Sequence, residues 1–224
     1  MGAPMSAVRT IAAHLVVALL VPAGALAEPE IEVLERQHLS GTATGAPATA
    51  SHRLNLTLVN IEGSGWTRER AVAALRETAA ILGQCGVAVD GVEWLRLSAP
   101  PRFLDFSTPV ARELARLQPV TRPAVYLVRD TLNRPAFEAE AIGRGNSRSR
   151  PELADTVWIT AATRDPGIVL AHELAHVLMD NGEHSDEPGN LMRDQTTAGS
   201  TALTPAQCAR MRNTGSGNGL LAQP

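Results

Sequence analysis

Lysine is missing from this chain of 224 residues, and all 20 of its basic side chains are arginines. Against them stand 23 acidic residues, so the formal net charge is -3. A chain with this balance lacks the basic excess that is typical of proteins that bind nucleic acid or anionic membranes. The sequence therefore predicts no nucleic-acid partner, and the missing lysine by itself indicates no chemistry.

Long hydrophobic runs are scarce as well. The apolar stretch IAAHLVVALLVPAG, residues 11–24, is short for a transmembrane helix. It follows Arg9 and precedes the small-residue sequence ALA that ends at Ala27, which is the pattern of a cleaved secretory signal peptide. We expect residues 1–27 to be removed and the mature chain to be secreted or periplasmic, with no stable membrane insertion. An uncleaved anchor is the alternative, and the lack of a cysteine after the stretch argues against a lipid anchor.

Cysteine is rare too, with only Cys85 and Cys208 in the whole chain. Two distant cysteines in an exported protein usually pair, so we expect a disulfide between them. The bridge would tie the first half of the domain to its C-terminal helix and contribute about 4 kcal/mol by loop-entropy arithmetic. Zinc binding by these cysteines is less favoured, because neither belongs to a C-x-x-C pair.

The remaining sequence predicts one domain, because hydrophobic residues make up 44% of the chain and no internal repeat is present. Residues 28–51, rich in Gly, Ala, Ser and Thr, are expected to be a flexible lead-in. The domain then spans 52–213, and residues 214–224 form a flexible Gly-rich tail. Strand and helix patterns alternate along the domain, which favours an α/β or α+β fold with a mixed sheet.

Hydrophobic periodicity and capping residues place the individual elements. The strands expected are 53–61, 87–97, 122–130, 136–143 (a polar edge strand) and 154–160 (a central strand). The helices expected are 67–86 capped by Thr67, 107–119 capped by Thr108, 166–181 opened by Asp165 and Pro166 and stopped by Gly182, and 205–212 opened by Thr204.

The helix at 166–181 carries the strongest chemical signal in the chain. His172 and His176 are one helical turn apart, so both imidazoles point to the same side and can reach one ion. Glu173 lies about 100° around the helix, where it can act on a water instead of binding the metal. This H-E-x-x-H arrangement predicts a zinc site with a general base.

A third metal ligand is expected just after the helix. His184 follows Gly182, and a chain that turns at a glycine can fold back toward the histidine side of its own helix. Imidazole suits zinc, which favours His184. The carboxylates of Asp180, Glu183 and Asp186 remain alternative oxygen ligands.

The segment HELAHVLMDNGEHSDEPGNLM resembles the active site of the metzincin clan of zinc endopeptidases, especially its matrixin-like branch. The residues that carry the resemblance are His172, Glu173, His176, Gly182, His184, Ser185 and Met192. It implies a single domain with a twisted, mostly parallel sheet, an active-site helix and a C-terminal helix. It also implies that Met192 lies in a tight turn beneath the metal.

The segment departs from the metzincin pattern in two places. Met179 stands where the family has a glycine, and the third histidine comes two residues later than usual. We expect the helix to continue for about half a turn before Gly182 to absorb this insertion. Arg193 follows Met192 where some metzincins have a tyrosine nearby, and Tyr126 is the chain's single tyrosine, far away in sequence.

The stretch CGVAVD from Cys85 is similar to the segment that keeps matrixin precursors latent. Its place between a helix and a strand of the domain, with Cys208 as a partner, favours the disulfide instead.

These features predict a secreted zinc endopeptidase with one zinc held by His172, His176 and His184. Glu173 would act as the base, and a peptide or protein substrate would lie along the edge strand 136–143. Two alternatives stay open: a zinc-binding module without turnover, and an interaction protein whose histidines bind nothing. The sequence carries no signal, for or against, on calcium binding or on the oligomeric state.

Overall fold

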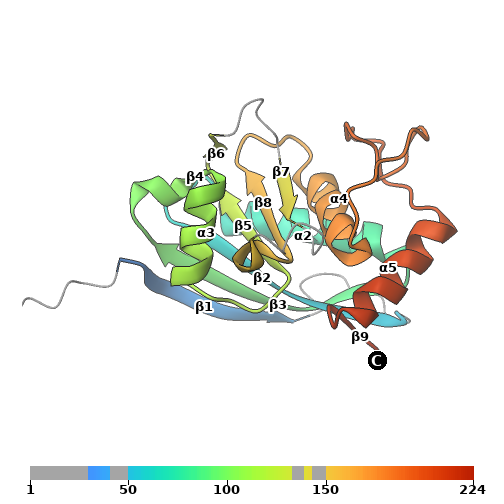
Figure 1. Ribbon diagram of the computed structural model, residues 1–224, viewed down its shortest axis with the longest axis horizontal. Helices are drawn as coiled ribbons and strands as arrows, with labels where there is room; N and C mark the ends of the chain where they lie inside the picture. The colour runs from blue at the N-terminus through green and yellow to red at the C-terminus, as the bar shows by residue number, and fades with distance from the viewer. Residues whose placement is uncertain (1–29, 41–49, 133–138, 143–149) are drawn as a thin grey trace, which may run out of the picture.

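The computed structural model describes residues 30–40, 50–132, 139–142 and 150–224 (Figure 1). Its helices are α2 (Arg68–Gly83), α3 (Thr108–Leu117), α4 (Pro166–Met179) and α5 (Pro205–Gly217), with 3-10 turns at Pro101–Leu104 and Pro151–Leu153. Its strands are β1 (Glu32–Ser40), β2 (His52–Ile61), β3 (Val87–Ser98), β4 (Asp105–Phe106), β5 (Ala124–Val128), β6 (Asp130–Thr131), β7 (Ala139–Ile142), β8 (Thr156–Thr160) and β9 (Leu221–Ala222).

Most of the described strands form one twisted sheet in the order β1-β3-β2-β5-β8-β7. Strands β3, β2, β5 and β8 run parallel, whereas β1 and β7 run antiparallel at the two ends. The short strand β9 pairs antiparallel with the beginning of β2, and β4 pairs with β6 apart from the main sheet. The expected α/β fold with a mixed, mostly parallel sheet is therefore confirmed.

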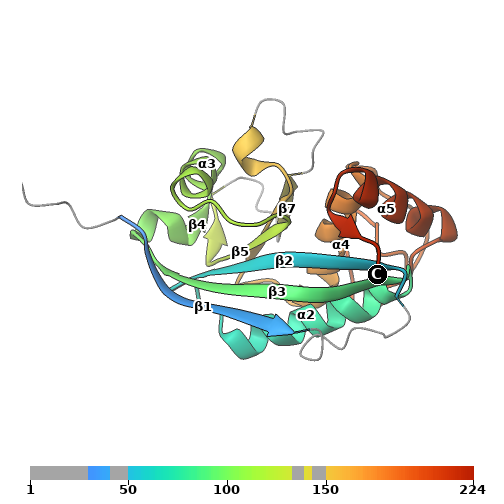
Figure 2. The ribbon, with the colours of Figure 1, turned by 90° about the horizontal axis from the view of Figure 1, so that it is seen from below.

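Each face of this sheet carries its own hydrophobic core. Side chains alternate between the two faces along a strand, so Leu58 joins the core beneath α2 and α4, whereas Val59 joins the core beneath α3. The side chains of strand β8 alternate in the same way: Ile159 joins the core beneath α2 and α4, and Trp158 joins the core beneath α3. Figure 2 shows α2 and α3 on opposite sides of the strands. Helix α4 follows β8 and contacts both β8 and β7, which places it near one end of the sheet.

Helix α5 is fastened to the rest of the domain by the disulfide between Cys85 and Cys208, the pairing expected for an exported chain. Cys85 lies in the turn between α2 and β3, and its Cα atom is 4.8 Å from that of Cys208. A side-chain bond adds to this link, because Nη1 of Arg212 on α5 donates to the carbonyl oxygen of Cys85 at 2.8 Å. Disulfides persist in oxidising compartments, so the bridge favours an extracellular or periplasmic setting.

Both expected flexible ends contain regular structure, and those expectations are wrong where the structure describes them. Within the lead-in 28–51, residues 32–40 form β1, whose backbone pairs with β3 although most of its side chains are exposed. Within the tail 214–224, α5 continues to Gly217, and Leu221 is buried in the core beside β2. Strand pairing thus orders residues 32–40 and 221–222, although neither stretch shows a clear hydrophobic pattern in the sequence.

The remaining expectations for single elements are mostly confirmed. Thr67 caps α2 by accepting from the Arg70 amide at 3.2 Å, and α5 begins after Thr204. Helix α3 begins at Thr108, so the cap position belongs to Ser107, one residue before the expected cap Thr108. Strand β8 has neighbours on both sides, as expected of a central strand.

Some predictions fall outside the described residues. These are the signal peptide 1–27, residues 41–49 of the lead-in, and the parts of the edge strand beyond Ala139–Ile142. Among the residues described, no helix is both long enough and apolar enough to cross a membrane.

Candidate metal centre

Helix α4 carries His172, Glu173 and His176 in a nearly enclosed position. It is packed against α2, α5 and the sheet, and almost all of its side chains are buried. At its first turn the Thr78 hydroxyl of α2 donates to the carbonyl oxygen of Gly167 at 2.9 Å. A side chain on Gly167 would collide with Glu77, so glycine permits this close approach of the two helices. The helix is thereby held in place from the α2 side.

The end of α4 differs from the expectation. The helix stops at Met179, and Asp180 adopts the left-handed conformation with φ of 50°. The amide of Asn181 then donates to the carbonyl of His176 at 3.3 Å, which closes the helix end. The prediction that Gly182 ends the helix, and that the helix is prolonged to absorb the extra residues, is wrong. Aspartate tolerates the left-handed region better than most residues, so it can take glycine's place.

Three histidine rings converge beside this helix end. The Nε2 atom of His176 is 2.9 Å from that of His172 and 3.3 Å from that of His184. All three ligand atoms lie within 4.8 Å of one another. Nitrogens bound to one tetrahedral zinc at about 2.0–2.1 Å lie about 3.3 Å apart, so the spacing fits such an ion.

The opposite ring nitrogens of the two helical histidines are fixed by backbone carbonyls. Nδ1 of His172 lies 2.7 Å from the carbonyl oxygen of Leu191, and Nδ1 of His176 lies 2.8 Å from that of Asn181. A carbonyl only accepts, so each Nδ1 must donate a proton, and each neutral ring keeps a lone pair on Nε2. Two lone pairs facing each other at 2.9 Å repel unless a cation lies between them. The donor set therefore fits a metal ion.

Burial keeps these rings neutral. Removal from water and, to a smaller degree, the neighbouring His172 together lower the pKa of His176 to about 4. Burial likewise lowers the pKa of His172. Metals bind neutral imidazole, so both rings are ready to bind at neutral pH.

His184 reaches the cluster from the loop after α4. Its side chain is 37% exposed, and its Nδ1 lies 3.7 Å from the Asp194 carboxylate. The loop returns on itself, because the Ser185 amide donates to the carbonyl oxygen of Met192 at 2.7 Å. Met192 is 1% exposed and belongs to the core that contains α4. The structure thus brings together all three histidines that the sequence singled out, and it buries Met192 in the core that contains α4.

Glu173 lies on α4, and its role as the base stays a prediction. It follows His172 on α4 and is only partly buried, whereas its neighbours Leu174 and Ala175 are fully buried. A partly buried carboxylate keeps the ability to exchange a proton, which the proposed role requires.

Other candidate residues lie elsewhere. Among the described residues, the ligand group contains no carboxylate. Glu183 instead accepts from Asn181 at 2.9 Å and pairs with Arg210 of α5 at 3.2 Å. Tyr126 lies in the core on the opposite face of the sheet. Cys85 is bonded to Cys208, which leaves no thiol for the latency role considered for CGVAVD.

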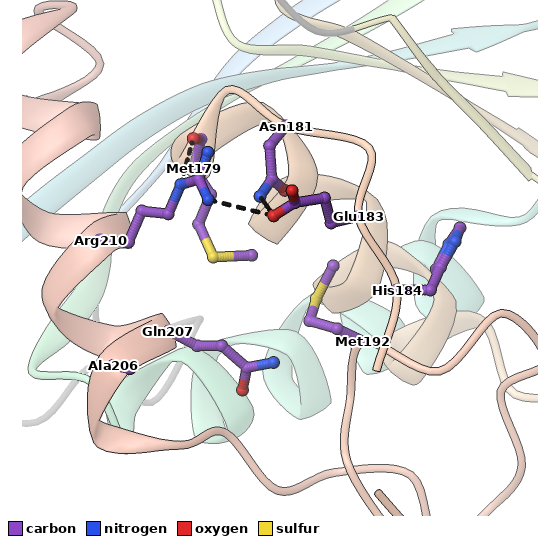
Figure 3. A pocket seen from close by; sticks show the side chains of 8 residues that line it. All are labelled: Met179, Asn181, Glu183, His184, Met192, Ala206, Gln207 and Arg210. Carbon is purple, nitrogen blue, oxygen red and sulfur yellow. Dashed lines mark hydrogen bonds and ion pairs between the residues drawn. The ribbon is translucent and has the colours of Figure 1, made fainter. Parts of the chain in front are cut away.

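A pocket of about 210 Å³ adjoins the cluster, between the end of α4, the following loop and α5 (Figure 3). Met179 and Met192 line it from the α4 and loop sides, and Gln207 and Arg210 reach it from α5. From the sequence, α5 was not expected to take part in the site. The spacing of Thr204 and Gln207, which is that of a capping box, was the one available signal.

No protein-family model and no curated protein sequence matches this chain. Its fold is similar to that of metalloproteinase-II from Bacteroides fragilis, with a TM-score of 0.56 and 17% sequence identity. The match covers 78% of this chain and 60% of the Bacteroides chain, so this chain spans less than two thirds of its length. At this identity the likeness establishes a metalloproteinase-like fold.

Proposed function

We propose that this protein is a secreted zinc-dependent endopeptidase. The observation that carries the proposal is the convergence of the Nε2 atoms of His172, His176 and His184, with two of the rings locked by backbone carbonyls. These three nitrogens would hold the ion and leave its fourth position open. Zinc bound in this way supplies a Lewis acid that polarises a peptide carbonyl and lowers the pKa of a water molecule.

Glu173 supplies the proton transfer. Its carboxylate takes a proton from the attacking water and then delivers it to the nitrogen of the leaving amine. The position next to His172 on a rigid, buried helix restricts the carboxylate to one side of the site. A positioned group of this kind contributes to the reaction barrier and little to metal affinity.

Strand β7 is the proposed binding surface for the substrate backbone. Among the described strands it lies at the end of the main sheet, next to β8 only, and α4 runs beside it. An extended peptide can add to such an edge by backbone hydrogen bonds. This arrangement favours hydrolysis within a peptide chain.

The proposal includes export by the signal peptide at residues 1–27. The disulfide supports this route, because a bridge between Cys85 and Cys208 forms readily outside the cytoplasm.

The test compares zinc content and peptide hydrolysis in the wild type, Glu173→Ala and Glu187→Ala. Glu187 is an exposed acid of the loop that follows α4 and serves as the control. We expect Glu173→Ala to retain zinc and lose ~100-fold or more of the hydrolysis rate, with Glu187→Ala unchanged. Equal turnover in Glu173→Ala would remove it from the mechanism. Zinc in every sample with no turnover on a broad peptide library would favour a zinc-binding module.

A further inference from the structure

The carbonyl oxygen that fixes His172 belongs to Leu191, one residue before Met192. It lies 2.7 Å from Nδ1 of His172 and sets both the tautomer and the orientation of that ring. Contacts that fix the backbone around Leu191 therefore also fix the orientation of the His172 ring.

The side chain of Asn190 fixes this backbone from within the loop. Its Oδ1 accepts from the Met192 amide at 2.9 Å, so one side chain bridges across Leu191. Asn190 is 2% exposed, and water cannot replace this bond readily. The backbone of Leu191 itself donates to the carbonyl oxygen of Ala202 at 2.7 Å.

The amide of Asn190 is in turn oriented by α5. Nδ2 of Asn190 donates to Oε1 of Gln207 at 3.1 Å, and Nε2 of Gln207 donates to Oδ1 of Asn190 at 3.0 Å. This reciprocal pair fixes which end of the Asn190 amide is the acceptor. With the amide reversed, its NH₂ group would face the Met192 N–H, and the bond across Leu191 would be lost.

Gln207 is held by the start of its own helix. Its side-chain Oε1 accepts from the backbone amide of Thr204 at 2.8 Å, and its own backbone amide donates to the Thr204 hydroxyl at 3.2 Å. The residue that follows, Cys208, is covalently bound to Cys85. Gln207 is therefore a rigid support and not a mobile surface side chain.

We infer that Gln207 and Asn190 are positioning residues for the metal centre, and that they act on His172 through the carbonyl of Leu191. The inference rests on the metal-binding part of the proposed function. It gives α5, which carries no metal ligand, a defined part in metal affinity. His176 is anchored separately by Asn181, so the effect is specific to one ligand.

The test uses Gln207→Glu, which keeps the size of the side chain and loses the donation to Asn190. Gln207→Met, which has a similar length and no polar atoms, is the second variant should Gln207→Glu fold poorly. Thr204→Ala is the matched control, because it weakens the cap of the same helix and leaves the amide pair in place. Urea unfolding of each variant reports its stability separately.

The measurements are zinc affinity, by competition with a chelator, and the Nδ1 proton resonances of His172 and His176 in the zinc-loaded full chain. We expect Gln207→Glu and Gln207→Met to weaken zinc binding about 10-fold and to shift the His172 resonance, leaving His176 unchanged. Thr204→Ala should keep the wild-type affinity within about twofold. An unchanged affinity in both Gln207 variants, or an equal loss in Thr204→Ala, would overturn the inference. Absence of zinc binding by the wild type would instead contradict both the inference and the proposed function.

Discussion

Tyr126, the chain's single tyrosine, is fully buried and stacked on Trp158 with ring centroids 4.1 Å apart. Its hydroxyl has no hydrogen-bond partner in the part of the chain that is described. Burial raises the pKa of this hydroxyl, and the charge of Arg122 opposes the shift weakly. The folded state therefore favours the neutral phenol, whereas the unfolded chain ionises near pH 10.

Stability should consequently fall as the pH rises above about 10, because only the unfolded state then releases the proton. The chain has no lysine that titrates in that range, and both cysteines are bonded. The loss of stability is therefore assigned to Tyr126. Tyr126→Phe should remove the pH dependence and keep the stability at pH 8 within about 1 kcal/mol. Urea unfolding of the wild type and of Tyr126→Phe at about pH 8 and pH 11 measures the stability at pH 8 and its change with pH. A phenol that titrates reversibly near pH 10 while the protein stays folded would contradict this expectation.

At single residues, helical geometry made part of the site predictable. His172 and His176 are related by one helical turn, and any regular helix brings them together. His184 is different, because its place depends on the path of a loop. The turn that directs this loop uses Asp180 in a conformation usually taken by glycine, and the sequence pointed to Gly182. Asn190 gave no local signal, because its partner Gln207 is 17 residues away.

Among the elements, α5 depends most on a long-range link. Its disulfide closes a loop between residues 123 positions apart, and constraining such a loop stabilises a protein by about 4–5 kcal/mol in the chain-entropy account. We expect the double variant Cys85→Ser/Cys208→Ser to lose about this much free energy of unfolding. Zinc affinity should also fall, because α5 carries Gln207. Urea unfolding and chelator competition test the two effects, with wild-type protein under reducing conditions as a second comparison. Unchanged values for both would mean that packing alone holds α5.

The elements that the sequence missed share one property. Strand β1 exposes most of its side chains, and β9 has only two residues, so neither shows the alternation that reveals a half-buried strand. Each is ordered by backbone pairing with a strand distant in sequence. Strands β2, β5 and β8 were predictable because their side chains fill the cores on the two faces of the sheet.

For the whole molecule, the two hydrophobic cores are formed by apolar side chains and do not depend on the proposed metal. Removal of zinc should therefore preserve the secondary structure and lower the unfolding temperature. Zinc at about 1,000 times its dissociation constant contributes about 4 kcal/mol, which corresponds to a shift of about 10 °C for a domain of this size. Calorimetry with zinc and with a chelator measures the shift, and His184→Ala should show a much smaller one. If the wild type unfolded at the same temperature with zinc and with the chelator, a zinc site would be excluded.

The pairing of β9 with the beginning of β2 has a consequence for biosynthesis. Strand β5 covers β2 only from Thr57 onward, and the edge before it is completed by Leu221 and Ala222, close to the C-terminal end. A chain made from its N-terminus onward leaves this edge of β2 unpaired until residues 221 and 222 have been added. This part of the sheet therefore forms only after α5, and its folding depends on contacts between segments that lie about 170 residues apart.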